Sequence, residues 1–151
     1  MCIRDRLRPL PGEGGWWRSG DAGRLEADGL VILGRLDGAL HSGGVTVFPE
    51  QLEQRLRAAA AAAGLPLAEL LLLAEPDPVW GERLVALLRA DGDADPASLV
   101  QRLEALTRPW PAAERPRAWI PCPDLAPTAL GKWERGRWRH WFKETAPDGS
   151  C

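Results

Sequence analysis

The chain has 151 residues, which by length predicts a single domain with one core. Apolar residues make up 45% and the formal net charge is −2, so there is no general attraction to nucleic acid or to an anionic membrane surface. No apolar run is long enough to cross a bilayer. The scattered cysteines, Cys2, Cys122 and Cys151, argue against a disulfide framework and for a reducing, cytoplasmic setting. Two distant histidines do not suggest a metal site.

The first part of the chain predicts a linker followed by a β-hairpin. Residues 1–15 are rich in proline and glycine, and we interpret them as a linker or an artefactual leader. Ala22–Leu25 and Leu30–Leu33 are short strand candidates. Asp28 and Gly29 between them tolerate the positive φ that a tight hairpin requires, so we expect the turn there.

The segment that follows is dominated by glycine. Gly34 and Gly38 bracket a charged turn, and Gly43 and Gly44 leave main chain without side chains, against which a ligand or another domain could lie. Pro49 suits the first position of a helix, where its missing N–H would be unpaired anyway. The same pattern also fits an ordinary glycine-bounded turn before a helix.

The middle of the chain predicts a helix and two buried strands. Apolar residues at spacings of three and four predict a helix over Glu50–Ala63, which Gly64 would end. Leu70–Ala74 and Leu84–Leu88 are continuous apolar runs, typical of buried strands. Because residues 75–82 between them are rich in turn formers, we expect an antiparallel pair.

The last third predicts two more helices and a strand. Asp95 is an N-cap candidate followed by Pro96 at the first position of a helix. Ala118–Cys122 is a third strand candidate, and a final helix is expected at about Glu134–Phe142. Together these elements predict an α+β fold, with a small β-hairpin and a mostly three-stranded sheet packed with helices.

Three glycine-containing stretches have a distinctive order and spacing: Gly15-Trp16-Trp17-Arg18-Ser19-Gly20-Asp21, Gly34-Arg35-Leu36-Asp37-Gly38, and Leu125-Ala126-Pro127-Thr128-Ala129-Leu130-Gly131-Lys132-Trp133-Glu134-Arg135. They resemble signatures of the AMP-forming acyl-CoA synthetases, which are adenylate-forming enzymes. The resemblance covers nearly the whole chain but only the end of that family's proteins. Within the family, Ser42-Gly43-Gly44 followed by Val47-Phe48-Pro49-Glu50 looks most like the o-succinylbenzoate–CoA ligases of menaquinone or phylloquinone synthesis.

The resemblance implies a division of the chain. Residues 16–36 would be the end of the large-domain region with its hairpin, 37–143 the C-terminal lid domain, and 144–151 a disordered tail. The main partner would be the missing N-terminal domain of the same enzyme, which carries the family's phosphate loop. An alternative is a freestanding, non-catalytic binding or scaffold module that retains the lid fold.

The resemblance also implies roles for single residues. Lys132 would contact the carboxylate substrate and the nucleotide α-phosphate as a mobile point charge. Asp21 would accept hydrogen bonds from both ribose hydroxyls, and Arg35 would lie near the ribose and phosphate. Asp37 would be the hinge between an adenylating and a thioesterifying pose. Gly43 and Gly44 would flank the pantetheine tunnel.

Simpler interpretations of these residues stay open. Lys132 could be a solvated loop lysine and Asp21 an exposed turn residue. Arg35 could form a surface ion pair with Asp37 or Glu26. The lysine loop also departs from the family pattern, because Leu130 stands where Ser or Asn is usual. A second departure is Ala126, which stands where proline is usual.

The implied reaction joins a small carboxylic acid to ATP, giving acyl-adenylate and pyrophosphate, and then transfers the acyl group to CoA. ATP, Mg²⁺ and CoA would be the substrates and cofactors of the full-length enzyme, and we expect this fragment to bind none of them tightly. Tryptophans beside arginines, as at 133–139, could instead stack single-stranded nucleic acid. Burial on a helical face explains Trp138 and Trp141 better, so we expect neither nucleic acid nor a membrane as partner.

Overall fold

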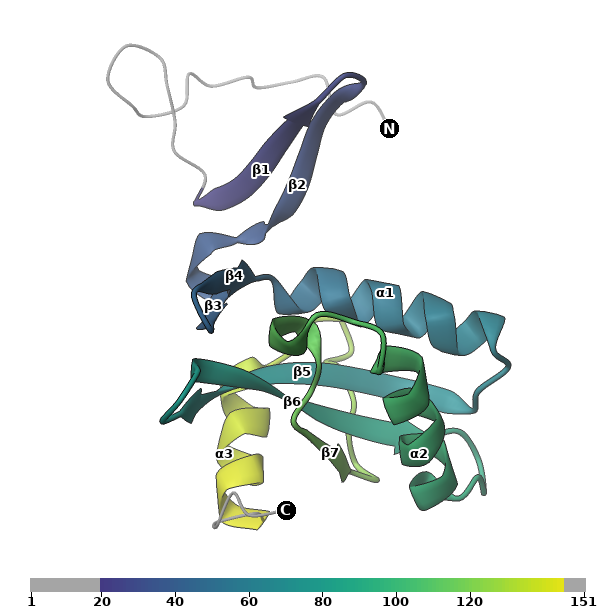
Figure 1. Ribbon diagram of the computed structural model, residues 1–151. Coiled ribbons are helices and arrows are strands. Elements are labelled where there is room, and N and C mark those ends of the chain that lie inside the picture. The colour runs from purple at the N-terminus through teal and green to yellow at the C-terminus, as the bar shows by residue number, and fades with distance from the viewer. Residues whose placement is uncertain (1–19, 146–151) are drawn as a thin grey trace.

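The computed structural model describes residues 20–145 of the chain. The proposed linker or leader, the Gly15–Ser19 part of the first signature and the last six residues lie outside the described residues. The described part has the expected α+β fold, with a small antiparallel hairpin and a mixed sheet packed with helices (Figure 1).

The first hairpin forms where the sequence predicts it. Strand β1 (Asp21–Glu26) pairs antiparallel with β2 (Gly29–Arg35), and it stands apart from the main sheet in Figure 1. Glu26 pairs with Gly29, so the turn residues are Ala27 and Asp28, one position earlier than expected. Gly29 keeps a positive φ of 137° at the start of β2.

A second, shorter hairpin was not expected. After a single 3₁₀ turn, η2 (Leu36–Gly38), strand β3 (Leu40–Ser42) pairs with β4 (Val45–Val47). Gly43 and Gly44 form its turn with φ of 55° and 81°, the left-handed conformation that a two-residue type I′ hairpin turn needs at both positions.

The main sheet is built on two long strands. Strand β5 (Leu67–Asp77) and β6 (Gly81–Ala90) are antiparallel, as expected, but each is about twice as long as the apolar run that predicts it. Their link is therefore only residues 78–80. Strand β7 (Ala118–Pro121) runs parallel to β6, and β3 joins β6 at Ser42 and Gly81. The three expected strands thus form the body of the sheet, and the short hairpin extends it to five.

Three α-helices cover the sheet: α1 (Pro49–Ala62), α2 (Pro96–Thr107) and α3 (Arg135–Thr145). The side chain of Asp95 accepts hydrogen bonds from the backbone N–H groups of Ala97 and Ser98, which confirms the predicted N-cap. A second 3₁₀ turn, η3 (Ala112–Glu114), interrupts the proline-rich crossing to β7. Helix α3 continues through Thr145, so it includes the first two residues of the predicted tail.

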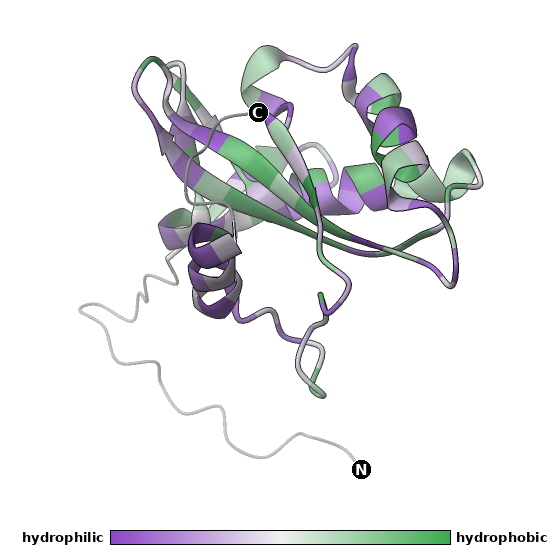
Figure 2. Ribbon diagram, turned by 90° about the horizontal axis from the view of Figure 1, so that it is seen from below, coloured by the Kyte–Doolittle hydropathy of each residue, from purple (hydrophilic) through white to green (hydrophobic). Residues whose placement is uncertain are grey.

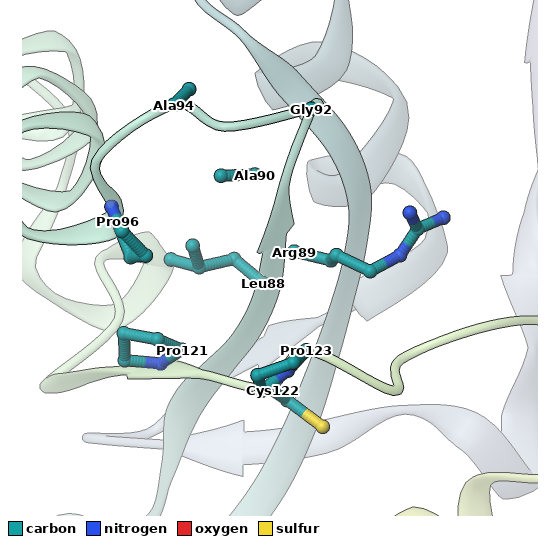
Figure 3. A pocket seen from close by; sticks show the side chains of 9 residues that line it. All are labelled: Leu88, Arg89, Ala90, Gly92, Ala94, Pro96, Pro121, Cys122 and Pro123. Atoms are coloured by element: carbon teal, nitrogen blue, oxygen red, sulfur yellow. The ribbon is translucent and has the colours of Figure 1, made fainter.

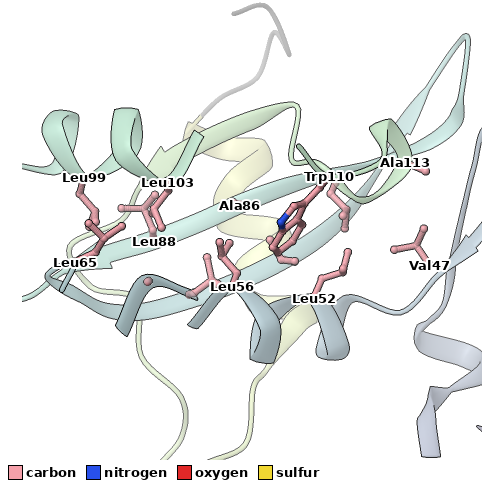
Figure 4. Packing of buried hydrophobic residues seen from close by; sticks show 14 of the residues in the cluster. Val47, Leu52, Leu56, Leu65, Ala86, Leu88, Leu99, Leu103, Trp110 and Ala113 are labelled. Atoms are coloured by element: carbon pink, nitrogen blue, oxygen red, sulfur yellow. The ribbon is translucent and has the colours of Figure 1, made fainter. Parts of the chain in front are cut away.

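Both faces of the β5–β6 pair are buried, because alternate side chains enter two different clusters. Leu72 and Leu88 pack with helices α1 and α2, whose side chains point into the same space in Figure 4. Leu73 and Leu87 pack on the other face with Trp138 of α3. A strand covered on both faces is apolar at every position, which explains the continuous runs in the sequence and the hydrophobic centre of the long strands in Figure 2.

We predict that Leu87→Ala lowers the free energy of unfolding by about 2–5 kcal/mol, because it leaves a cavity at a fully buried position in the middle of β6. The matched control is Leu130→Ala, since Leu130 is 85% exposed and should change stability by less than about 0.5 kcal/mol. Urea denaturation of both variants measures the difference. Equal losses would contradict the placement of β6 in the core.

Candidate functional site

The lysine loop was expected at residues 125–132, and in the structure residues 126–134 leave the body of the domain between two fixed points. At its start, Leu125 is fully buried and its carbonyl oxygen accepts a 2.9 Å hydrogen bond from Nε of Arg89. At its end, Arg135 is the first residue of α3, and its guanidinium donates a hydrogen bond to the carbonyl oxygen of Leu72 in β5. Both ends are anchored in the core, so the position of the loop is set by packing.

The turn that presents Lys132 is closed by three hydrogen bonds around Thr128. The N–H of Gly131 donates to the Thr128 carbonyl oxygen at 2.8 Å, and the Thr128 N–H donates to the Lys132 carbonyl oxygen at 2.8 Å. The Lys132 N–H donates to Oγ1 of Thr128 at 3.1 Å. Gly131 has a φ of 73°, as expected for the left-handed position of a three-residue hairpin loop.

This geometry explains why the two departures from the family signature leave the loop intact. The threonine supplies the hydroxyl and the glycine supplies the positive φ, and both are present. Leu130 and Ala126 are exposed, and neither contributes to the three bonds that close the turn. The loop therefore forms without the usual Ser or Asn at 130 and the usual proline at 126.

The Lys132 side chain is exposed and has no hydrogen-bond or ion-pair partner within residues 20–145. Most arginines of the sheet and helices are paired with carboxylates in the same domain, as Arg57 is with Glu69 and Arg117 with Asp77. An exposed, unpaired ammonium on a fixed turn can approach an anion presented from outside the domain.

Arg135 forms the most connected polar cluster in the described chain, together with Glu53. Glu53 was not identified from the sequence, whereas Arg135 belongs to the third signature. Its Nη1 donates to Oε1 of Glu53 at 3.0 Å and to the carbonyl oxygen of Leu72 at 2.7 Å, and its Nη2 donates to Oε2 of Glu53 at 3.0 Å. Oε1 of Glu53 also accepts the N–H of Leu72 at 2.7 Å. The Arg135 guanidinium thus joins the start of α3 to α1 and β5.

A signal for Glu53 was present in the sequence. It lies on the same helical face as Leu56 and Ala60, which are both buried, so a carboxylate there needs a cation. Burial raises the pKa of the Glu53 carboxyl above its ordinary value, although Arg135 and the Leu72 N–H oppose this shift. The cost of removing both groups from water therefore offsets much of the attraction between Glu53 and Arg135. The main effect of the pair is to fix the positions of α3, α1 and β5 relative to one another.

The two predicted nucleotide residues lie next to each other. Asp21 of β1 is directly opposite Arg35 of β2 in the hairpin register, and both are exposed. The Arg35 guanidinium donates to Asp37 through Nε at 2.8 Å and Nη2 at 3.0 Å. This is one of the two surface ion pairs left open for Arg35, and it lowers the pKa of the Asp37 carboxyl. The pair spans the predicted hinge.

Gly43 and Gly44 differ in their surroundings. A β-carbon on Gly43 would lie 2.6 Å from the ring of Trp80, and the Gly43 N–H donates to the Trp80 carbonyl oxygen at 2.9 Å. The main chain of Gly43 is thus covered by the domain's own tryptophan. Gly44 has no atom within 4 Å of its β-carbon position, so the bare main chain expected from the sequence is limited to Gly44.

A pocket among the described residues lies elsewhere and contains none of the predicted site residues. It has a volume of about 330 Å³ between the end of β6, the start of α2 and β7, and Figure 3 shows its lining. The guanidinium of Arg89 and the thiol of Cys122 point away from its centre. A pocket without converging polar groups does not orient a polar ligand.

Within residues 20–145, no group of three or more His, Cys, Asp or Glu side chains is placed so that it could hold a metal ion. No helix in the same range has the length and apolar character needed to span a bilayer.

No protein-family model matches the chain. Its relatives and structural neighbours are AMP-forming acyl-CoA ligases. It is 30% identical to an uncharacterized acyl–CoA ligase of Bacillus subtilis (strain 168) over 86% of this chain and 25% of that protein. It is 32% identical to the 2-succinylbenzoate–CoA ligase of Enterococcus faecalis over 78% of this chain and 23% of that protein.

Among solved structures, the anthranilate CoA ligase AuaEII in complex with anthranoyl-AMP matches with a TM-score of 0.71 and 26% identity, over 90% of this chain and 26% of that one. The fold is therefore the C-terminal domain fold of adenylate-forming enzymes. The chain spans about a quarter of the length of the relatives it matches.

We predict that Glu53→Ala lowers the free energy of unfolding by about 3–5 kcal/mol, because it leaves Arg135 half-buried without its main partner. The matched control is Glu114→Ala, which breaks the more exposed pair with Arg55 and should cost at most about 1 kcal/mol. Thermal or urea unfolding of the two variants gives the comparison. A Glu53→Ala variant as stable as Glu114→Ala would show that the cluster does not hold α3.

Proposed function

We propose that this chain is the C-terminal lid of an AMP-forming carboxylic acid–CoA ligase, and that it works with a larger N-terminal domain of the same protein. The observation that carries the proposal is Lys132, an exposed cation without a partner among residues 20–145, on a turn whose two ends are anchored in the core. The similarity to CoA ligases of which this chain covers only 25% and 23% supports the same conclusion.

In this proposal Lys132 acts during formation of the acyl-adenylate. The substrate carboxylate attacks the α-phosphorus of ATP, pyrophosphate leaves, and negative charge builds on the phosphate oxygens in the transition state. An ammonium placed there beforehand offsets that charge without reorganisation. Asp21 would receive the ribose hydroxyls and Arg35 would lie near the ribose and phosphate, which requires Arg35 to turn from Asp37 or to use its remaining donors.

The β1–β2 hairpin supports a large neighbouring domain. Leu25, Leu30 and Ile32 are 83%, 62% and 56% exposed, although they are large apolar side chains on a two-stranded hairpin. An isolated hairpin is marginally stable in water, and a cluster of exposed apolar residues marks a contact surface. We infer that the N-terminal domain covers this hairpin, and that Asp37 and Gly38 form the hinge about which the lid turns.

The second half-reaction would transfer the acyl group to CoA after the lid has turned. Gly43 and Gly44 would then flank the pantetheine arm, with the bare main chain of Gly44 as the closer approach. The Mg²⁺ that accompanies ATP would be held outside the residues described here. The similarity to the 2-succinylbenzoate–CoA ligase supports o-succinylbenzoate as the acid, and the reducing setting favoured by the cysteines supports a cytoplasmic location.

We predict that Lys132→Ala in the full-length ligase lowers the rate of adenylate formation by about 10²–10³-fold, by analogy with the loss of one transition-state donor. Transfer to CoA from supplied acyl-adenylate should largely survive. The matched control is Lys143→Ala, which removes the chain's other lysine from the exposed side of α3. Pyrophosphate release and thioester formation measure the two steps separately, and an equal loss in both would overturn the role of Lys132.

We predict that residues 1–151 alone neither bind ATP tightly nor form an adenylate, because the residues expected to hold the triphosphate lie in the N-terminal domain. Titration calorimetry of ATP into the chain, with Mg²⁺ present, should show no binding at micromolar concentrations. Micromolar affinity would contradict the proposed division of labour and would favour a freestanding nucleotide-binding module.

A further inference from the structure

The Arg135 cluster reaches one more residue, and that residue touches the hinge. Oε1 of Glu50, in the first turn of α1, lies 3.5 Å from Nη2 of Arg135. Glu50 and Glu53 therefore share one guanidinium, with Glu53 in the closer, doubly bonded position. Arg135 comes three residues after Lys132, so this guanidinium is held at the base of the lysine loop.

The same carboxylate of Glu50 also lies against Gly38. A β-carbon added at Gly38 would lie 3.3 Å from Oε1 of Glu50 and 3.9 Å from Oε2. Gly38 does not have a positive φ, so its backbone conformation does not require a glycine. A methyl group at Gly38 would press on the flexible end of the Glu50 side chain, so Gly38 is a point of contact between the hinge and α1.

The carboxylate of Glu50 is also incompletely satisfied. Its Oε2 is buried and has no hydrogen-bond partner within residues 20–145. A buried carboxylate oxygen without a donor has lost its hydrogen bonds to water, so its free energy falls when water or a donor reaches it. The other oxygen, Oε1, is the one that faces both Gly38 and Arg135, so motion of Gly38 away from α1 would let the carboxylate turn and would change how strongly Glu50 competes with Glu53 for Arg135.

We propose that Glu50 is a positioning residue that couples the Asp37–Gly38 hinge to the Lys132 loop through Arg135. The coupling rests on the proposed function, because the hinge and the role of Lys132 are part of it. When Gly38 packs against Glu50, the carboxylate is held beside Arg135 and the loop takes the position described here. When the hinge turns, Glu50 is released and the base of the loop shifts with Arg135.

The coupling can be tested in the 151-residue chain by a double-mutant cycle read by ¹H–¹⁵N NMR. Gly38→Ala places a methyl group against Glu50 and should shift the amide resonances of Gly131 and Lys132, far away in the sequence. In a Glu50→Ala background most of that shift should disappear, because the residue that transmits it is gone. In a Glu114→Ala background, the matched control, the shift should persist.

Two results of the cycle would overturn the coupling: loop resonances that do not respond to Gly38→Ala, or an equal response with and without Glu50. In the full-length ligase, Glu50→Ala should change the ratio of adenylate formation to CoA transfer by at least about twofold, the lower end of coupling between contacting residues. General destabilisation lowers both rates together and leaves that ratio unchanged, so an unchanged ratio also overturns the proposal. If the full-length protein forms no adenylate, the proposed function fails, while the NMR cycle still decides the coupling.

Discussion

The ion pair between Arg135 and Glu53 is the contact on which the rest of the site depends. It joins the first residue of α3 to α1 and to the main chain of β5, so three segments far apart in the sequence meet at one guanidinium. Burial raises the pKa of Glu53, which shows that the pair is formed at a desolvation cost. In return it permits one arrangement of these segments, and that arrangement determines where the lysine loop leaves the core.

The described chain combines a packed α+β body with a β-hairpin whose apolar side chains are exposed. Both faces of the β5–β6 pair are filled, by α1 and α2 on one side and by α3 on the other. The β1–β2 hairpin, in contrast, exposes its large apolar side chains, and it contacts the rest of the domain near the end of β2, where Gly34 lies against Phe48. This contrast fits the proposed lid, because the packed body holds the turn together while the segment at the base of the hairpin supplies the joint.

Sequence reasoning succeeded where one local rule decides the outcome. The N-cap at Asp95, the proline that opens α1 and the buried strands each follow from the chemistry of a few neighbouring residues. It failed for β3 and β4, which have three residues each and are too short for any periodicity to be visible. It also missed the cover of Gly43 by Trp80, because that contact depends on how β3 lies beside the β5–β6 turn.

The sequence by itself determined the three helices, the first hairpin, the long strands and the likeness to the end of an adenylate-forming ligase, since these depend on side chains close together along the chain. Only the tertiary structure decided that Glu53 holds Arg135 and that Glu50 lies between Gly38 and Arg135. A guanidinium can reach any carboxylate that folding brings near it. The choice among them is therefore made by the packing of helices on the sheet.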